Sequence, residues 1–392
     1  MWFRIFLLVP ALVVLLLAGW FATHKSANPS VLGRYSVSYA VALAAMAAAG
    51  LALLGLQARP MYARLFPMRW KFALLVGTLA LGICLLEVTV RLADPLGISY
   101  YFEVKKYVTL LVPDDDLIYH MRPNLRESFF GAPVQLNELG LRERPIGPKA
   151  AGEYRVLFLG DSITFGNGVK DDEPFARGVE PLLAAKLRRP VRTINAGVGS
   201  YNTSQEDAYL ARGGLQLEPD LVVLMYVQND FFQHARPFFP TAPSTAKSPL
   251  KKLVQFLEGS WLFKLPVHLI VGREGKYDAV PPLDDPGLVE SMNALRSIAK
   301  RCRERGIPLV VFFWRWQIEK VNVLLVAQIE KVAAEEKFRF ADILPWFAGL
   351  DFRKIVNSAV DSHPNARGHE ITAEGIVRYL VESGAAPPPR SP

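Results

Sequence analysis

Ser162 is the residue of this 392-residue chain whose setting first suggests chemistry. It lies in the stretch GDSITFG, directly after the apolar run VLFL. A serine hydroxyl is a weak nucleophile, so it needs a general base, a group that orients that base, and hydrogen-bond donors for the oxyanion that forms. A serine beside an aspartate can also simply cap a turn. The nucleophile interpretation therefore depends on partners elsewhere in the chain.

A histidine with a nearby carboxylate is the candidate base. The chain has six histidines, and His363 occurs in VDSHPNARGH, just before the last predicted helix. Asp361 precedes it by two residues, and side chains at this spacing can point to the same side in an extended or turn segment. We therefore expect His363 to act as the base and Asp361 to orient its ring. His369 is expected to be structural, whereas His234 can approach the site or be an ordinary loop histidine.

Two further loops contain candidate oxyanion donors. Asn229, in YVQNDFF, follows an apolar run, and the loop NAGVGSYNTSQ offers free backbone N–H groups after another. Asp161 is expected to support the turn that carries Ser162. Together the four loops contain the residue types that acyl transfer requires.

The elements that must position these residues follow an alternating pattern. Apolar runs at 154–160, 191–197, 220–226, 307–314 and 338–343 alternate with helical patterns at about 174–188, 203–214, 287–306, 318–336 and 365–382. Continuous apolar strands separated by helices predict a parallel sheet covered on both faces. In such sheets ligands bind beyond the carboxyl ends of the strands, where Ser162 is expected to lie.

These blocks resemble the SGNH, or GDSL-type, hydrolases over roughly residues 150–383. The resemblance implies a three-layer αβα doubly wound parallel sheet of the flavodoxin-like, SGNH hydrolase type. It also implies that Ser162 is the nucleophile, His363 the base and Asp361 the orienting acid. The backbone N–H of Ser162, the loop at Ser200 and the Asn229 side chain would form the oxyanion hole. The segment VQLNELGLRERP, residues 134–145, is similar to the lead-in of membrane-anchored members.

The sequence departs from the family pattern at three positions. Ser200 stands where the family has a glycine, and Val227 replaces the glycine of the third block. The acid and base are spaced D-x-H, through Asp361 and His363, rather than D-x-x-H. The last departure affects the predicted role of Asp361 most directly.

The first part of the chain predicts a membrane anchor. Apolar runs at 5–22, 36–57 and 72–90 are long enough to be three transmembrane helices. The loop between the second and third runs carries Arg59, Arg64, Arg69 and Lys71 and no acid, which favours a cytoplasmic position for this loop. A multi-pass inner-membrane protein with its catalytic domain in the periplasm is then expected. A cleaved signal peptide is the alternative interpretation of the first run, and it leaves the catalytic domain outside.

The chain thus divides into four predicted parts. Residues 1–93 form the anchor, 94–150 an irregular connector, 151–385 the SGNH-hydrolase-like domain and 386–392 a disordered tail. An insertion at about 241–286 is either a flap over the membrane or the site, or a segment packed on the domain's own surface. Glu87, four residues before Arg91, either contacts a lipid-linked substrate or forms an ordinary ion pair, and the ion pair is favoured.

Composition narrows the function classes. The net charge of +8 can indicate nucleic acid or a bilayer surface, but the basic residues are scattered and match no nucleic-acid motif, so no nucleic-acid partner is expected. The two cysteines match no metal spacing, and neither metal nor organic cofactor is expected. The favoured function is a serine esterase acting on acyl, above all acetyl, esters of an extracytoplasmic glycan or lipid. An O-acyltransferase with the same triad and a non-catalytic envelope scaffold are the alternatives.

Overall fold

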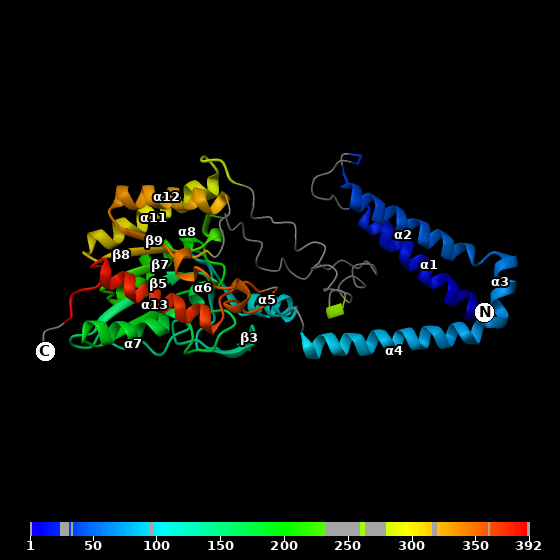
Figure 1. The fold of residues 1–392 in the computed structure, drawn as a ribbon, viewed down its shortest axis with the longest axis horizontal. Helices are drawn as coiled ribbons and strands as arrows, with labels where there is room; N and C mark the ends of the chain where they lie inside the picture. Colours follow the sequence, from blue (N-terminus) through cyan, green and yellow to red (C-terminus); the bar gives the residue numbers. More distant parts are fainter. Residues whose placement is uncertain are drawn as a thin grey trace. The chain divides into compact units, whose positions relative to one another are not determined.

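The structure is a computed structural model in which two compact units are distinguished, Met1–Ala93 with Ala246–Lys264, and Asp94–Thr245 with Leu265–Pro392. Figure 1 shows the elements of both units in sequence colours. The structure describes residues 2–23, 31–32, 34–94, 97–231, 259–262, 280–315, 320–359 and 361–389.

The N-terminal unit is helical. Its elements are α1 Trp2–Phe21, α2 Val37–Gly55, α3 Arg59–Leu65, the 3-10 helix η1 Phe66–Met68 and α4 Arg69–Ala93. Ser36 caps α2, because its hydroxyl accepts a hydrogen bond from the Tyr39 N–H at 3.4 Å. Helices α1 and α2 lie side by side in Figure 1. A Cβ at Gly50 would lie 2.6 Å from Leu15 Cγ, so this glycine permits the close approach.

One helix of the described chain, Arg59–Ala93, is long and apolar enough to cross a membrane by length and composition. Only 6% of its apolar window is buried, and large side chains such as Leu74 and Leu92 are exposed. The apolar stretches Phe3–Gly19 and Tyr39–Gly55 fall short of the required length. Three spans therefore stay a prediction.

Glu87, near the end of α4, forms the expected ion pair with Arg91, at 2.7 Å between Oε1 and Nε. The same carboxylate also accepts hydrogen bonds from the Ser260 hydroxyl and from the N–H groups of Trp261 and Leu262. These residues belong to the insertion predicted at 241–286, and they form part of the N-terminal unit. Most of that insertion lies outside the described residues, so its two interpretations stay open.

The second unit is built on a five-stranded parallel sheet. Its strands are β5 Tyr154–Gly160, β6 Val191–Asn195, β7 Leu221–Tyr226, β8 Leu309–Phe313 and β9 Arg339–Asp342, in the order β6-β5-β7-β8-β9. Every residue of β5, β7 and β8 is buried, as continuous apolar strands require. The predicted parallel sheet is confirmed. The strand order reverses between β5 and β7, which is the position where open sheets bind ligands.

Helices cover both faces of this sheet (Figure 1). One face packs against α7 Phe175–Leu187 and α13 Ala366–Glu382. The other face packs against α8 Thr203–Arg212, α11 Pro286–Glu304 and α12 Lys320–Glu336. All five helices were expected from the sequence, with ends that agree within a few residues. The αβα layering of the prediction is therefore confirmed.

The connector at 94–150 is more regular than expected. It contains α5 Ser99–Thr109 and two antiparallel hairpins, β1 Leu111–Asp114 with β2 Ile118–Met121, and β3 Arg126–Phe129 with β4 Ala132–Gln135. Its apolar side chains, Tyr107 and Tyr119 among them, form a third core with Phe165 and Tyr201. Each strand has four residues, and β1 and β4 contain prolines, so the alternation that marks a strand is too short to recognise.

Five short helical turns complete the described part of this unit. They are α6 Ser162–Phe165, η2 Gly214–Leu217, η3 Gln228–Phe231, η4 Leu344–Phe347 and η5 Phe352–Lys354. Helix α6 follows β5 and η3 follows β7, so both turns stand at the carboxyl edge of the sheet beside the topological switch.

Candidate active site

Ser162 is the first residue of α6, in the sharp turn after β5. Gly160 ends the strand with φ of +153°, and a Cβ there would lie 2.1 Å from Thr164 Oγ1. Asp161 caps the helix, because its Oδ1 accepts the Ile163 N–H at 2.8 Å. Gly166 ends the helix in the left-handed conformation, with φ of +85°. Asp161 and Gly166 thus fix the two ends of the short helix that carries Ser162.

Ser162, His363 and Asp361 lie in one hydrogen-bonded line. His363 Nε2 is 2.8 Å from Ser162 Oγ, and His363 Nδ1 is 2.5 Å from Asp361 Oδ1. A carboxylate at Nδ1 favours the tautomer with its proton there, so Nε2 is free to accept the serine proton. The His363 side chain is 14% exposed and that of Asp361 is 7% exposed. Burial lowers the pKa of His363, but the hydrogen bond and the charge of Asp361 raise it by more than burial lowers it. The pKa of His363 is therefore above its ordinary value.

The short spacing between acid and base is made possible by a tight loop. Asp361 Oδ1 also accepts the backbone N–H of His363 at 3.1 Å, so one oxygen holds both the ring and its main chain. Ser358 accepts the Asp361 N–H at 3.0 Å. Asn357 donates from Nδ2 to Asp361 Oδ2 at 3.1 Å and to the Asn167 carbonyl at 2.9 Å. Sequence reasoning missed Asn357, because no local pattern marks an amide that acts across the fold.

Asn229 approaches the same turn from the end of β7. Its Nδ2 donates to Asp161 Oδ2 at 3.1 Å, and Ser162 Oγ lies 3.2 Å from the same oxygen. An amide nitrogen carries two protons, so one is held by Asp161 and the other can serve an oxyanion. Asp230 fixes the turn of η3, because its Oδ2 accepts the Val227 N–H at 3.1 Å. Burial raises the pKa of Asp161, although these hydrogen bonds oppose the shift.

Ser200 lies in the loop after β6 and adopts φ of +65°, the left-handed conformation that favours glycine. The loop is fixed to the site strand, because the Val198 N–H donates to the Gly160 carbonyl at 3.1 Å. It is also held by the Tyr119 hydroxyl, which donates to the Gly199 carbonyl at 2.9 Å. The serine thus takes the backbone shape expected for the family's glycine. Its oxyanion role stays a prediction.

The remaining candidates are placed as follows. His369 is fully buried in α13, and its Nδ1 accepts the Phe175 N–H at 3.2 Å, which fits the expected structural role. Burial lowers the pKa of His369 to about 3. His234 lies outside the described residues. Tyr100, which sequence reasoning did not place at the site, has its ring 6.0 Å from the His363 ring.

Metal chemistry gains no support from the described residues. Among them no group of three or more His, Cys, Asp or Glu side chains is placed to hold an ion. Ser162, His363 and Asp361 form an arrangement that can transfer a proton and an acyl group. A serine, histidine and aspartate in line at the carboxyl edge of an α/β sheet are the arrangement that an acyl-transferring serine enzyme requires.

The comparison with known families agrees. Residues 158–371 match the model of the GDSL-like lipase/acylhydrolase family, which is more than half of the chain. The chain therefore belongs to this family and is an ester-hydrolysing enzyme. No curated protein matches the sequence.

Several solved structures are similar in fold. A two-domain esterase active on acetylated mannans aligns with a TM-score of 0.40 and 18% identity, over 62% of this chain and 53% of that one. A lipase/acylhydrolase from Enterococcus faecalis aligns with a TM-score of 0.39 and 16% identity, over 61% and 100%. An acetylxylan esterase from Geobacillus stearothermophilus aligns with a TM-score of 0.37 and 18% identity, over 58% and 94%. The alignment thus spans about half the length of the mannan-active esterase.

Proposed function

We propose that the protein is a membrane-anchored serine esterase that removes acyl groups, acetyl groups above all, from an extracytoplasmic glycan or lipid. The observation that carries the catalytic part is the line of hydrogen bonds from Ser162 Oγ to His363 Nε2 at 2.8 Å and from Nδ1 to Asp361 at 2.5 Å. Three groups in this order convert a weak nucleophile into an active one.

In the first half-reaction Ser162 Oγ attacks the ester carbonyl carbon while His363 Nε2 takes the hydroxyl proton. The tetrahedral intermediate then collapses, and the proton passes from His363 to the departing alcohol oxygen. Asp361 stays ionised and stabilises the imidazolium that forms between these steps. In the second half-reaction His363 takes a proton from water, which attacks the acyl carbon of the acyl-enzyme. The second tetrahedral intermediate then collapses, the bond from the acyl carbon to Ser162 Oγ breaks, and His363 returns the proton to Ser162 Oγ as the acid leaves.

The oxyanion would be held by the Ser162 N–H, the Asn229 amide and the N–H of Ser200. The held orientation of Asn229 supports this role, because Asp161 fixes one of its two amide protons and thereby directs the other. Preorganised donors of this kind commonly supply the largest single part of an esterase's rate enhancement.

The proposed location rests on the N-terminal unit. Helix α4 exposes large apolar side chains such as Leu74, Ile83 and Leu85, which a lipid phase would cover. Arg59, Arg64 and Lys71 are exposed at and before the start of this helix, and positive charge favours the cytoplasmic side. The catalytic unit follows the other end of α4, which implies an extracytoplasmic site and substrates found there.

The full chain, purified in detergent, should release acetate from p-nitrophenyl acetate and from acetylated envelope glycan. A series of p-nitrophenyl esters from acetate to decanoate tests the preference for a short acyl group. Ser162→Ala should abolish release from every ester. The acyltransferase alternative predicts that an added glycan acceptor captures the acyl group in place of water. A folded wild-type protein that releases no acid and transfers no acyl group would overturn the proposal.

A further inference from the structure

Arg142 lies in the lead-in segment before the catalytic unit's first parallel strand, with only 4% of its surface exposed. Its Nε donates to Asp171 Oδ1 at 2.9 Å. Its two terminal nitrogens donate to four main-chain carbonyls, those of Phe165 at 3.3 Å, Gly166 at 2.5 Å, Pro133 at 3.3 Å and Val169 at 2.6 Å. These five bonds use the full donor set of a guanidinium group.

Two of these carbonyls, those of Phe165 and Gly166, belong to the end of the helix that begins with Ser162, and that of Val169 lies in the loop that follows. The fourth, that of Pro133, lies in β4. Helix α6 has four residues, so its last turn leaves carbonyl groups without helical partners. Arg142 donates hydrogen bonds to two of them, those of Phe165 and Gly166. The Thr164 carbonyl is taken by Asn195 Nδ2 at 2.8 Å. Three successive carbonyls behind Ser162 are thus held by side chains from other parts of the fold.

The loop that follows connects this clamp to the acid. Asn167 lies between two residues whose carbonyls Arg142 holds, and its own carbonyl accepts a hydrogen bond from Asn357, which also binds Asp361. A Cβ at Gly168 would lie 2.0 Å from Asn357 Nδ2, so the loop and this amide are in close contact. The loop at 166–169 therefore contacts both Arg142 and Asn357, the residue that binds Asp361.

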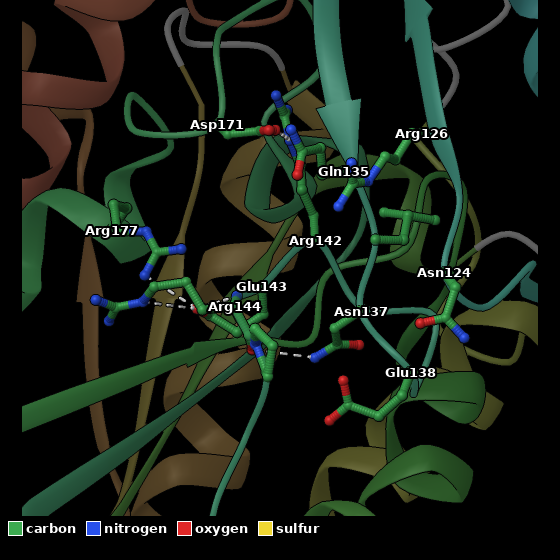
Figure 2. Close-up of a pocket in the computed structure, with 12 residues that line it drawn as sticks. Asn124, Arg126, Gln135, Asn137, Glu138, Arg142, Glu143, Arg144, Asp171 and Arg177 are labelled. Atoms are coloured by element: carbon green, nitrogen blue, oxygen red, sulfur yellow. Dashed lines mark hydrogen bonds and ion pairs between the residues drawn. The ribbon is translucent and has the colours of Figure 1, made fainter.

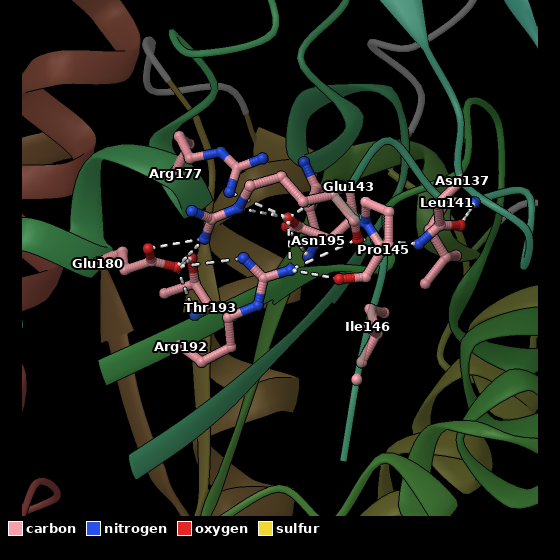
Figure 3. A network of polar contacts seen from close by, with 12 residues as sticks. Asn137, Leu141, Glu143, Pro145, Ile146, Arg177, Glu180, Arg192, Thr193 and Asn195 are labelled. Atoms are coloured by element: carbon pink, nitrogen blue, oxygen red, sulfur yellow. Dashed lines mark hydrogen bonds and ion pairs between the residues drawn. The ribbon is translucent and has the colours of Figure 1, made fainter. Parts of the chain in front are cut away.

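The residue that follows Arg142 is fixed by ion pairs and a hydrogen bond to other parts of the fold. This neighbour, Glu143, forms ion pairs with Arg177, at 3.0 Å from Nη1, and with Arg192, at 3.1 Å from Nη2. Glu143 also accepts a hydrogen bond from the Asn195 N–H at 3.3 Å. Figure 3 shows this network, which joins the lead-in segment to α7 and to β6. Asn195 thus joins the Glu143 network to the α6 carbonyl at Thr164.

We propose that Arg142 is a positioning residue, which fixes Ser162 Oγ relative to His363 and Asp361 without touching the substrate. This inference rests on the proposed function, because it assigns the distance between nucleophile and base to a residue outside the triad. Without Arg142 the end of α6 and the loop at 166–169 lose the hydrogen bonds that hold three of their carbonyls, those of Phe165, Gly166 and Val169. A shift of the nucleophile by about 1 Å is enough to lower turnover roughly 100-fold.

A cavity beside Arg142 makes the proposal testable by chemical rescue. The cavity has a volume of about 410 Å³, and Figure 2 shows Arg142, Asp171, Gln135 and Arg126 among its lining residues. Removal of the Arg142 side chain would extend this space to the carbonyls that it binds. Guanidinium ion, which carries the same planar set of N–H donors, can then occupy the vacated position.

The experiment compares Arg142→Ala with wild type and with Arg155→Ala. Arg155 is an equally buried arginine, 4% exposed, that also pairs with a carboxylate and donates to carbonyls, but it lies at the start of β5 and does not line the cavity. Turnover of p-nitrophenyl acetate by the full chain in detergent is measured with and without millimolar guanidinium chloride. Thermal unfolding gives the folded fraction by which each rate is scaled.

Arg142→Ala should lower kcat roughly 100-fold and leave KM within about twofold, and guanidinium should restore at least about tenfold of the lost kcat. Arg155→Ala should keep kcat per folded molecule and gain nothing from guanidinium. Arg142→Lys keeps the charge but not the fork of donors, so it should fold and still lose kcat. If Arg142→Ala does not fold, the kcat of Arg142→Lys tests the positioning role.

Three results would overturn the inference. One is an undiminished kcat in folded Arg142→Ala or Arg142→Lys. Another is a gain from guanidinium that is equal in Arg155→Ala. The third is absence of turnover in the wild type, which overturns the proposed function as well. Turnover in the wild type with unchanged Arg142 variants overturns the positioning role alone.

Discussion

Replacement of Asp361 by asparagine tests the geometry of the acid–base pair. Both oxygens of Asp361 are occupied, Oδ1 by the ring and main-chain N–H groups of His363 and Oδ2 by Asn357. Asparagine has one acceptor oxygen, so one of these positions must receive an amide NH₂ group. If the NH₂ group faces Asn357, two donors meet, and Asn357 cannot turn without also losing its bond to Asn167.

If the NH₂ group faces His363 instead, the ring must present a lone pair at Nδ1. Its proton then sits on Nε2, which faces Ser162 and can no longer accept the serine proton. Either arrangement loses a charge-assisted hydrogen bond, about 1.5–3 kcal/mol, and leaves a buried donor unpaired, about 1–3 kcal/mol. The sum, about 2.5–6 kcal/mol, corresponds to a roughly 10²–10⁴-fold loss of kcat.

The assay is p-nitrophenyl acetate turnover across a pH series, with kcat and KM separated. Wild-type activity should fall on acidification through a pKa above the ordinary histidine value of 6.5, since the base must be neutral. In Asp361→Asn that limb should move to lower pH, because the charge that raises the pKa of His363 is gone. Asp351→Asn, the same change at an exposed turn residue, should leave kcat unaltered. A kcat for Asp361→Asn within about tenfold of wild type would refute the reasoning.

Three further predictions follow from other contacts. Asn229→Ala should lower kcat roughly 10²–10³-fold with a small change in KM if its amide serves the oxyanion, and an unchanged kcat in steady-state kinetics would exclude that role. His369 is buried with a pKa of about 3 against an ordinary 6.5, so the unfolded chain binds a proton that the folded chain does not. The free energy of unfolding should therefore fall as pH falls below about 6, by about 1.4 kcal/mol per pH unit. In His369→Asn this dependence of the unfolding free energy on pH, measured by denaturant titration at two pH values, should be weaker than in the wild type. An alkaline phosphatase reporter fused after residue 389 should be active and one fused after residue 57 inactive, whereas the reverse pattern would contradict the proposed topology.

The sequence predicts the sheet and its helices well, because buried parallel strands read as continuous apolar runs. It also places Ser162, Asn229 and His363 at one edge, since parallel strands end together there. The hairpins of the connector escape prediction because four-residue strands with proline carry too little alternation. The sequence does not show whether Asp361, two residues before His363, can reach the imidazole ring. Its orientation depends on hydrogen bonds with Asn357, Ser358 and the His363 main chain that form only in the folded protein.

Asn357 and Arg142 escape prediction for another reason. Both donate to main-chain carbonyls, and because every residue has a carbonyl, the sequence does not show which of them is bound. The Asn167 carbonyl that Asn357 binds is 190 positions away in the chain. Long-range contacts of this kind follow from tertiary packing, not from local spacing. The three-span anchor, in turn, stays a prediction because only one described helix has the length and composition to cross a membrane.

Labelling with a fluorophosphonate probe tests the central claim most directly, because this reagent reacts with a serine only when a base activates it. The full chain is treated with the probe, digested and analysed by mass spectrometry, with Ser162→Ala and His363→Ala alongside. The account predicts a single adduct on Ser162 in the wild type and none in either variant. A folded wild type that carries no adduct, or an adduct that persists in Ser162→Ala, would contradict it.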